Sequence, residues 1–329
     1  MGQVKERNYH FDNIKALLIF LVVLGHMLSQ FDTAGATGLL YKIIFSFHMP
    51  AFIFVSGYFA KYNPKGVWAK LVPLYLFCQC IHIVFNYVVG CMDAGQLQPF
   101  HIQFFTPQWT LWYLFALIVY QLMIPIFDTP VKKRRIVYLI VAMLLGLAIG
   151  LNHGGNFMAI SRVFHFLPLF LLGYYEKDGQ LLLTFFKRKK QVLSRVITAC
   201  AAVALLVWFA LQYKQFNARW FFGTESYGDK GFTWYICLMT WGVALVWIII
   251  LLVWIPEKKL PLVETIGKNT LSVYILHGLA ILVLKEIVLG EFIKGNFTVI
   301  IALSVVMTVC LSWNGFERFF RRIAIPYKK

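Results

Sequence analysis

Ionisable side chains inside long apolar runs are the residues of this sequence that could do chemistry. His26 lies deep in the run IKALLIFLVVLGHMLSQF, and His48 lies in IIFSFHMPAFIF, two residues before Pro50. Neutral imidazole accepts a proton near neutral pH, so a buried histidine can act as a general base on a hydroxyl group. The two histidines therefore predict a polar site inside an otherwise apolar protein.

Lys15 precedes His26 by eleven residues. At 100° per residue this spacing returns a helix to within about 20° of the same face, and it separates the two residues by roughly 16 Å along the axis. Lys15 is thus expected near one end of a membrane span, with His26 deep in it. A simpler alternative is that Lys15 extends to the membrane surface and only pairs with Asp12, three residues earlier.

Four further polar residues are expected inside spans. Arg162 and His165 are three residues apart in SRVFHFLPLFLLGYY, and Tyr274 and His277 share a face of NTLSVYILHG. A buried arginine predicts an anionic partner or substrate, because ionisable groups within the membrane are costly unless paired. His82 has no polar neighbours in the sequence, so it is expected to be a hydrogen-bonded core residue.

The chemistry that the sequence lacks is also informative. No carboxylate is placed deep in an expected span, which counts against a proton- or cation-coupled transporter. Asp12, Glu176, Glu264, Glu286 and Glu317 all fall near span ends. No GxSxG, HExxH or glycine-rich phosphate loop is found. The six cysteines have no metal-ligand spacing, so no metal is expected.

Composition identifies the elements that must position these residues. The 329 residues are 60% hydrophobic and only 14% charged, and the mean hydropathy is +0.71. These values predict an all-α polytopic membrane protein. About ten apolar runs are long enough to span a bilayer; we place them near residues 14–30, 39–60, 71–90, 108–127, 136–152, 160–175, 196–213, 233–254, 269–289 and 297–314.

The net charge of +17 comes from short Lys and Arg runs between apolar segments. This pattern is typical of cytoplasmic loops rather than of a surface that binds nucleic acid, and it predicts that the N and C termini are both cytoplasmic. The loop at 214–232 is expected on the opposite, extracytoplasmic side. It contains a mixture of polar, charged and aromatic residues: Asn217, Arg219, Trp220, Glu225 and Asp229. Such a mixture suits either sugar recognition or an ordinary interfacial loop. We expect a single integral-membrane domain over residues 1–329.

Five segments resemble the membrane-bound acyltransferase-3 family, and most closely its fucose 4-O-acetylase-like branch. They are YHFDNIKALLIFLVVLGH (9–26), IFSFHMPAFIFVSGYF (44–59), WTLWYLFALI (109–118), SRVFHFLPLFLLGYY (161–175) and IGKNTLSVYILH (266–277). The resemblance implies about ten transmembrane helices with cytoplasmic termini, in agreement with the charge pattern.

The resemblance also implies an activity: transfer of an acyl group, usually acetyl from acetyl-CoA, to a hydroxyl of an extracytoplasmic glycan or glycolipid. The expected location is the plasma membrane of a bacterium. The family's first-helix motif falls on Lys15 and His26, with lysine where arginine is commoner. Lysine keeps the charge but lacks the bidentate fork that suits a phosphate.

These observations lead to one hypothesis for the site. Lys15 and Asp12 bind the acyl-CoA donor, and His26 acts as general base or is itself acylated. His48 positions the thioester or stabilises the oxyanion, while Arg162, His165, Tyr274 and His277 contact the acceptor. Two alternatives remain open: a carrier of a lipid-linked sugar or small metabolite, and a membrane partner of an assembly complex. Nothing in the sequence defines the acceptor or the oligomeric state.

Overall fold

A computed structural model describes residues 7–153, 157–178, 191–288 and 290–323. This part of the chain is helical, with no β-strand in the ranges given. The α-helices are α1 (Tyr9–Phe31), α2 (Gly35–Phe59), α3 (Pro64–Gly66), α4 (Val72–Ala94), α5 (Trp112–Phe127), α6 (Lys132–Ala148), α7 (Ile160–Glu176), α9 (Gln191–Leu211), α10 (Trp234–Trp254), α11 (Pro261–Lys268), α12 (Thr270–Val283), α13 (Gly290–Ile293), α14 (Phe297–Leu311) and α15 (Asn314–Arg322).

The polytopic membrane fold is confirmed. Eight helical segments in the described ranges are long and apolar enough to cross a membrane. Two further candidates are bent pairs: α11 and α12 meet at 76°, and α14 and α15 meet at 56°. The first eight expected spans therefore match single helical segments, whereas the last two correspond to broken helices.

Helix α1 begins earlier than its apolar run indicates. The Asn8 side chain accepts a hydrogen bond from the Phe11 amide and caps the helix, so a polar first turn precedes the apolar residues. One continuous helix therefore carries both Lys15 and His26. Helix α2 likewise runs through Pro50 as a single element.

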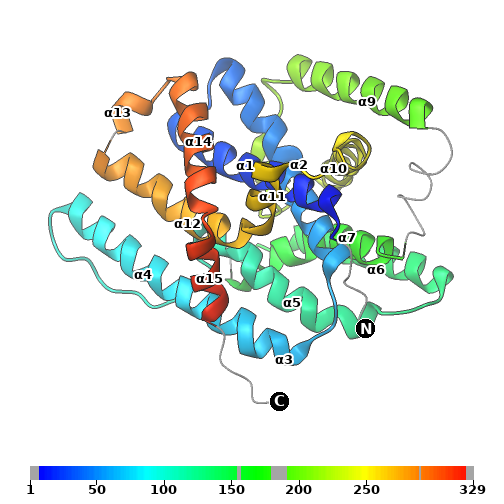
Figure 1. The fold of residues 1–329 in the computed structure, drawn as a ribbon, viewed down its shortest axis with the longest axis horizontal. Helices are drawn as coiled ribbons and strands as arrows, with labels where there is room; N and C mark the ends of the chain where they lie inside the picture. The colour runs from blue at the N-terminus through cyan, green and yellow to red at the C-terminus, as the bar shows by residue number, and fades with distance from the viewer. Residues whose placement is uncertain (1–6, 154–156, 179–190, 289, 324–329) are drawn as a thin grey trace.

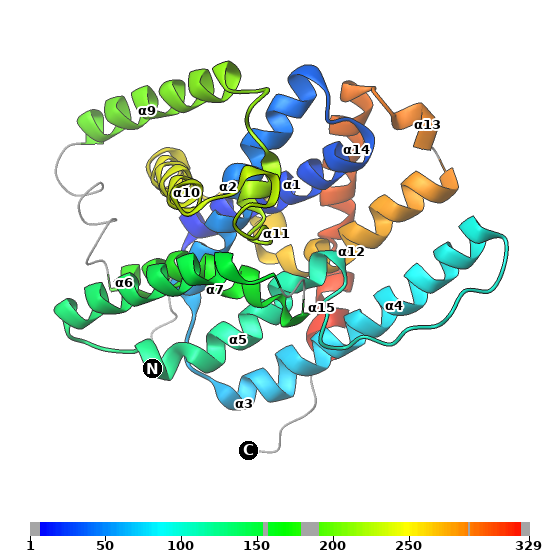
Figure 2. The ribbon, with the colours of Figure 1, turned by 180° about the vertical axis from the view of Figure 1, so that it is seen from behind.

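Helix α2 is the central element of the bundle, and its most extensive packing is against α7. Figures 1 and 2 show α2 crossing the middle of the molecule, with α4 and α9 at the periphery. Two glycines allow the close approach: a Cβ on Gly57 would overlap the Phe170 carbonyl, and one on Gly173 would overlap the Phe54 carbonyl. Small residues at such crossings let two membrane helices pack backbone to backbone.

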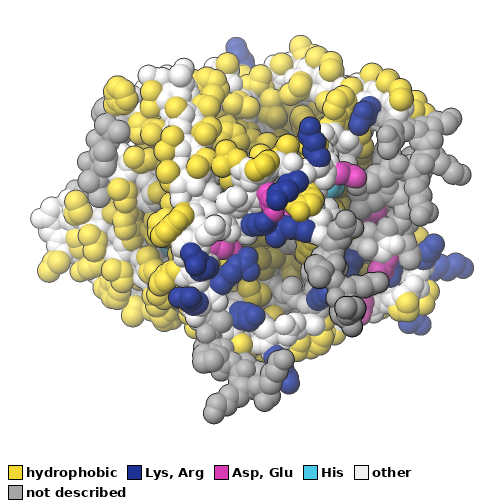
Figure 3. Space-filling view, viewed as in Figure 1, with side chains coloured by type: hydrophobic (Ala, Val, Ile, Leu, Met, Phe, Trp, Pro, Cys, Tyr) yellow, Lys and Arg dark blue, Asp and Glu magenta, His cyan; other side chains and the backbone are white. Residues whose placement is uncertain are grey.

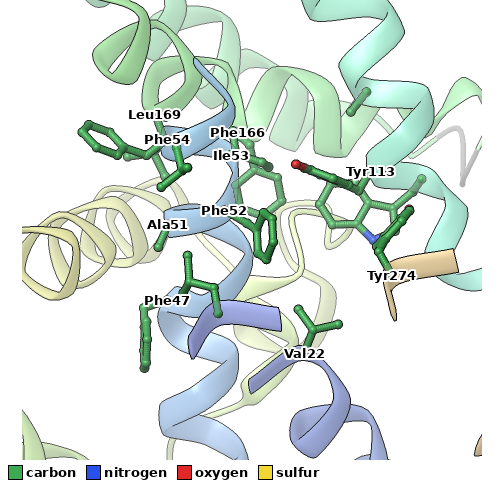
Figure 4. Close-up of a cluster of buried hydrophobic side chains, with 14 of the residues drawn as sticks. Val22, Phe47, Ala51, Phe52, Ile53, Phe54, Tyr113, Phe166, Leu169 and Tyr274 are labelled. Carbon is green, nitrogen blue, oxygen red and sulfur yellow. The ribbon is translucent and has the colours of Figure 1, made fainter. Parts of the chain in front are cut away.

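Buried aromatic and aliphatic side chains surround α2. Figure 4 shows side chains of α2 and α7 gathered near Tyr113 of α5, Tyr274 of α12 and Val22 of α1. Within this cluster the Tyr113 hydroxyl is 2.6 Å from Ser56 Oγ. The helices that carry the expected site residues are thus fixed to one another by a common core.

The two bent pairs are joined where their helices break. Asn269, between α11 and α12, donates to the Ser312 carbonyl and to Asn314 Oδ1, each at 2.7 Å. From α15, Glu317 accepts a 2.9 Å hydrogen bond from the Ser272 amide in the first turn of α12. Backbone groups freed by the breaks are therefore bonded to polar side chains, as a non-aqueous environment requires.

Candidate active site

A cavity of about 130 Å³ lies where α1, α2, α5, α7 and α12 converge. Five of the residues expected to be functional line it, namely His26, His48, Arg162, Tyr274 and His277. Apolar and aromatic side chains form the rest of the wall, together with Thr110; they are Val22, Phe45, Met49, Trp109, Trp112, Phe166, Phe221 and Phe222. The site therefore combines a few polar groups with a mostly apolar enclosure, as ligand pockets usually do.

For two of the three imidazoles in the cavity, a hydrogen bond shows which ring nitrogen is the donor. His48 Nδ1 lies 2.8 Å from the Ile44 carbonyl, and His277 Nδ1 lies 2.7 Å from the Tyr274 carbonyl. A carbonyl oxygen only accepts, so each Nδ1 is the donor, and in the neutral ring Nε2 is then an acceptor. Both Nε2 atoms are buried and have no partner in the described part of the chain. Each can accept a proton or a hydroxyl hydrogen bond.

His26 occupies the position between these groups. Its ring centroid lies 5.3 Å from that of His277 and 5.1 Å from that of Trp109. It also contacts Phe45 edge to face, and it lines the same cavity as His48 and Arg162. The helix position predicted for His26 thus places its ring among the other polar groups of the site.

Arg162 contributes the positive charge of the site. Its guanidinium carbon lies 4.9 Å from the centroid of the Trp112 ring, and Nε donates to the Phe222 carbonyl at 3.3 Å. No carboxylate of the described chain forms an ion pair with it. The anionic partner that the sequence predicts for this arginine is thus absent from the described ranges, which leaves its terminal nitrogens for a substrate.

Tyr274 is anchored by hydrogen bonds to the segment before α5 and to the first turn of α5. Its hydroxyl donates to the Thr110 carbonyl and accepts from the Leu114 amide at 3.3 Å. Trp109, at the start of this segment, has a φ of +29°, a strained conformation for a residue that carries a Cβ. The Trp109 ring lies against His26 at the cavity wall.

The loop before α10 closes another side of the cavity through Phe221 and Phe222. Its polar residues pair with one another: Glu225 lies 3.1 Å from Lys230 and 3.9 Å from Arg219. Burial raises the pKa of Tyr227 to about 12, so the hydroxyl stays protonated and donates to the Leu147 carbonyl at 2.6 Å. The loop is thereby fixed to the end of α6.

Three expected site residues lie outside the cavity. His165 is buried against α10, where its Nδ1 is 3.7 Å from Cys237 Sγ and its carbonyl accepts from Trp241 Nε1. Lys15 pairs with Asp12 at 2.9 Å, and its Nζ lies 5.7 Å from the Phe59 ring centroid. Asp12 also accepts from Arg7 at 2.6 Å. The ion pair between Lys15 and Asp12 that the sequence suggested is therefore present. Lys15 lies eleven residues before His26 on α1, outside the cavity.

One residue of the cavity wall, Thr110, has no counterpart in the sequence analysis, and another buried residue, His82, differs from its prediction. The Thr110 hydroxyl is buried on the cavity wall with no partner in the described ranges. His82 was expected to be hydrogen-bonded, but neither of its ring nitrogens has a partner among the described residues. His82 is thus a buried core residue, 1% exposed, but the expected hydrogen bond is not found in the described part of the chain.

Comparison with known proteins identifies a distant relative, the nodulation protein NolL of Mesorhizobium japonicum. The two sequences are 28% identical over 125 residues, and the matched region covers 33% of this chain and 34% of NolL. The chain thus matches about a third of the length of that relative. No solved structure matches the chain.

A family model described as an acyltransferase domain matches residues 8–314. The matched range includes every residue that lines the cavity. Because it extends over nearly the whole chain, this protein belongs to the acyltransferase-3 family.

Proposed function

We propose that this protein is a membrane-bound O-acyltransferase that moves an acetyl group from acetyl-CoA to a hydroxyl of an extracytoplasmic or surface glycan. The observation that carries the proposal is the convergence of His26, His48, His277 and Arg162 on one cavity. Family membership supports acyl transfer. The donor, the glycan acceptor and a bacterial plasma membrane location are our inferences from the site and from the earlier resemblance to the fucose 4-O-acetylase-like branch.

In this mechanism the acceptor hydroxyl attacks the thioester carbonyl, and His26 takes the hydroxyl proton. The tetrahedral intermediate then collapses, the C–S bond breaks, and the imidazolium of His26 returns the proton to the leaving CoA thiolate. An acylated His26 that relays the group is the alternative route. Either route places His26 in contact with the reacting atoms.

The hydrogen bonds of the other side chains suggest how they divide the remaining roles. Neutral His48 and His277 present acceptor nitrogens, which suits holding hydroxyl groups of the acceptor rather than an oxyanion. Arg162 carries donors and positive charge, so we assign oxyanion stabilisation to it. We retain His48 as the second catalytic residue because its Nε2 can take the hydroxyl proton if the acceptor binds on that side.

The cavity has room for the thioester end of the donor but not for the whole coenzyme. We therefore propose that the nucleotide of acetyl-CoA binds at the cytoplasmic end of α1, near Lys15 and Asp12. On α7 and α12, His165 and Tyr274 support the acceptor side by positioning Arg162 and His277. Several side chains around the site, such as His48 and His277, can bind hydroxyl groups. This property is consistent with a glycan or glycolipid acceptor.

Exchange of His26 tests the catalytic assignment. His26→Ala should lower acetyl transfer by about 10² to 10⁴, the usual contribution of a general base, while leaving the protein yield and melting temperature near those of the parent. The rate of CoA release from acetyl-CoA, measured with a panel of glycans, provides the readout. His101→Ala, on an exposed loop residue, is the matched control. Normal transfer by His26→Ala would show that the assignment is wrong.

Donor binding can be tested without knowledge of the acceptor. Acetyl-CoA and CoA, but not ATP, should raise the melting temperature of the purified protein, because a ligand at a hundred times its Kd stabilises the folded state by about 2.7 kcal/mol. Lys15→Ala should weaken the shift. Stabilisation by neither coenzyme at millimolar concentration would instead favour the carrier hypothesis.

A further inference from the structure

A second hollow, separate from the cavity, lies between α1, α11 and α14. This groove has a volume of about 290 Å³, and its lining is almost entirely apolar; among the lining residues are Leu17, Phe20, Val263, Ile266, Val305 and Val309. None of the residues assigned to catalysis or to substrate binding lines it. The proposed acyl transfer therefore does not account for the groove.

The groove is open at the outer surface of the helix bundle, along α14. Val305 and Val309, on its α14 wall, are 45% and 38% exposed. Helix α14 belongs to a bent pair that is apolar enough to cross a membrane. Exposed valines on such a helix are expected to face lipid acyl chains, and this would give lipid direct access to the groove.

One end of the groove is polar. Pro256 and Leu260 line it, and Lys258, between them in the sequence, is bonded through its backbone to Asn13 in the groove wall. Asn13 Nδ2 donates to the carbonyls of Pro256 and Lys258 at 2.9 and 3.0 Å, which fixes this connection to α1. Asn13 itself lines the groove, is 4% exposed, and its Oδ1 has no partner in the described ranges. A buried acceptor of this kind is costly unless a ligand or a water molecule supplies the donor.

Basic side chains outnumber carboxylates around this end. The cations are Arg7, Lys15, Lys258, Lys259 and Lys268, and the carboxylates are Asp12, Glu257 and Glu264, a net charge of about +2. Lys259 and Lys268 pair with Glu264, whereas Lys258 forms no ion pair within the described chain. Figure 3 shows Lys and Arg side chains gathered over α11 and the start of α1, beside the hydrophobic surface of α14.

We propose that the groove binds one anionic phospholipid of the phosphatidylglycerol type. An acyl chain fills the apolar groove, and the phosphate lies at Lys258, where the connection after α10 reaches the membrane surface. A headgroup hydroxyl supplies the donor that Asn13 Oδ1 lacks. Basic pockets between transmembrane helices bind anionic headgroups in this way, and burial of the acyl chain distinguishes the site from one for free phosphate.

Native mass spectrometry of the full-length, delipidated protein tests the proposal. We expect phosphatidylglycerol to bind more tightly than phosphatidylcholine with the same acyl chains, and inorganic phosphate not to compete. Lys258→Ala should weaken phosphatidylglycerol binding about fivefold, the factor that corresponds to about 1 kcal/mol per basic residue at a membrane surface. Lys133→Ala, on an exposed lysine of α6, should leave it unchanged.

Two tryptophan variants test the groove itself. Val305→Trp should abolish the preference for phosphatidylglycerol by filling the groove, whereas Val306→Trp, at the neighbouring exposed position outside the groove, should retain it. If Val305→Trp does not fold, Val309→Trp tests the same wall. Equal binding of the two lipids, displacement by phosphate, or identical behaviour of the Val305 and Val306 variants would overturn the proposal.

Discussion

The three imidazoles of the cavity differ in what their hydrogen bonds leave available. Backbone carbonyls of their own helices fix His48 and His277 with Nδ1 as the donor. The ring of His26 instead has aromatic neighbours on two sides and His277 on a third. At the residue scale, His48 and His277 are therefore fixed as hydrogen-bond acceptors, whereas the ring of His26 is less constrained. A less constrained imidazole suits the role of proton carrier.

Thr110 provides a test of the cavity at this scale. Its buried hydroxyl has no partner in the described part of the chain, so replacement by the isosteric valine removes an unsatisfied polar group. Thr110→Val should leave the melting temperature unchanged or slightly raised, and it should raise the KM for the acceptor several-fold if the hydroxyl binds substrate. Steady-state kinetics and thermal unfolding measure the two effects separately. An unchanged KM would exclude Thr110 from acceptor binding.

Residue types and helix spacing predicted much of the candidate site, but not its enclosure. His26, His48 and His277 could be singled out because histidine is costly in an apolar span. His165 was expected beside Arg162 because of their spacing, yet its ring lies outside the cavity, against Trp241. Spacing tells which side chains share a face, and it does not tell which helix covers that face. Phe222 and Trp109 come from connections whose path depends on tertiary packing.

At the scale of the elements, the crossing of α2 and α7 fixes the relative positions of His48 and Arg162. The crossing depends on Gly57 and Gly173, each of which faces a backbone carbonyl of the other helix. The apolar runs predicted both helices but not their close contact, since a glycine in a single sequence does not reveal its partner. The last two spans were likewise predicted as straight runs, because the polar residues that join their breaks are far apart in sequence.

A glycine pair tests the crossing. Gly57→Ala should lower the free energy of unfolding by about 1–3 kcal/mol, since the added Cβ forces the two helices apart. Gly242→Ala, in α10, is the control: nothing lies within 4 Å of its Cβ, so the higher helix propensity of alanine should leave stability unchanged or raised. Thermal unfolding in the same detergent compares the two, and equal effects would mean that the crossing tolerates a methyl group.

At the scale of the whole molecule, composition alone was sufficient to predict the fold class, because a hydrophobic content of 60% with 14% charge is incompatible with a soluble domain of this length. The direction in which the bundle crosses the membrane remains a prediction from the basic loops. That direction decides which end of the site would face the proposed acyl donor and which end the proposed acceptor.

Cysteine labelling can determine the direction. In a background without the six native cysteines, Lys214→Cys should react with a membrane-impermeant thiol reagent added to intact cells, whereas Lys133→Cys should react only after permeabilisation. Both lysines are exposed and lie beyond opposite ends of predicted spans. The reverse pattern would invert the topology, and with it the assignment of the donor and acceptor sides.

The broken helices have a consequence for the bilayer itself. Helix α14 has 15 residues before the bend, so at 1.5 Å per residue it is about 22 Å long. This is shorter than the hydrocarbon thickness of about 30 Å. Hydrophobic mismatch of this size is relieved when the surrounding lipid thins. We expect the membrane to be thinnest beside α14, which packs against α12, the helix that carries His277. Such thinning would shorten the path between an acyl donor on one face and an acceptor on the other.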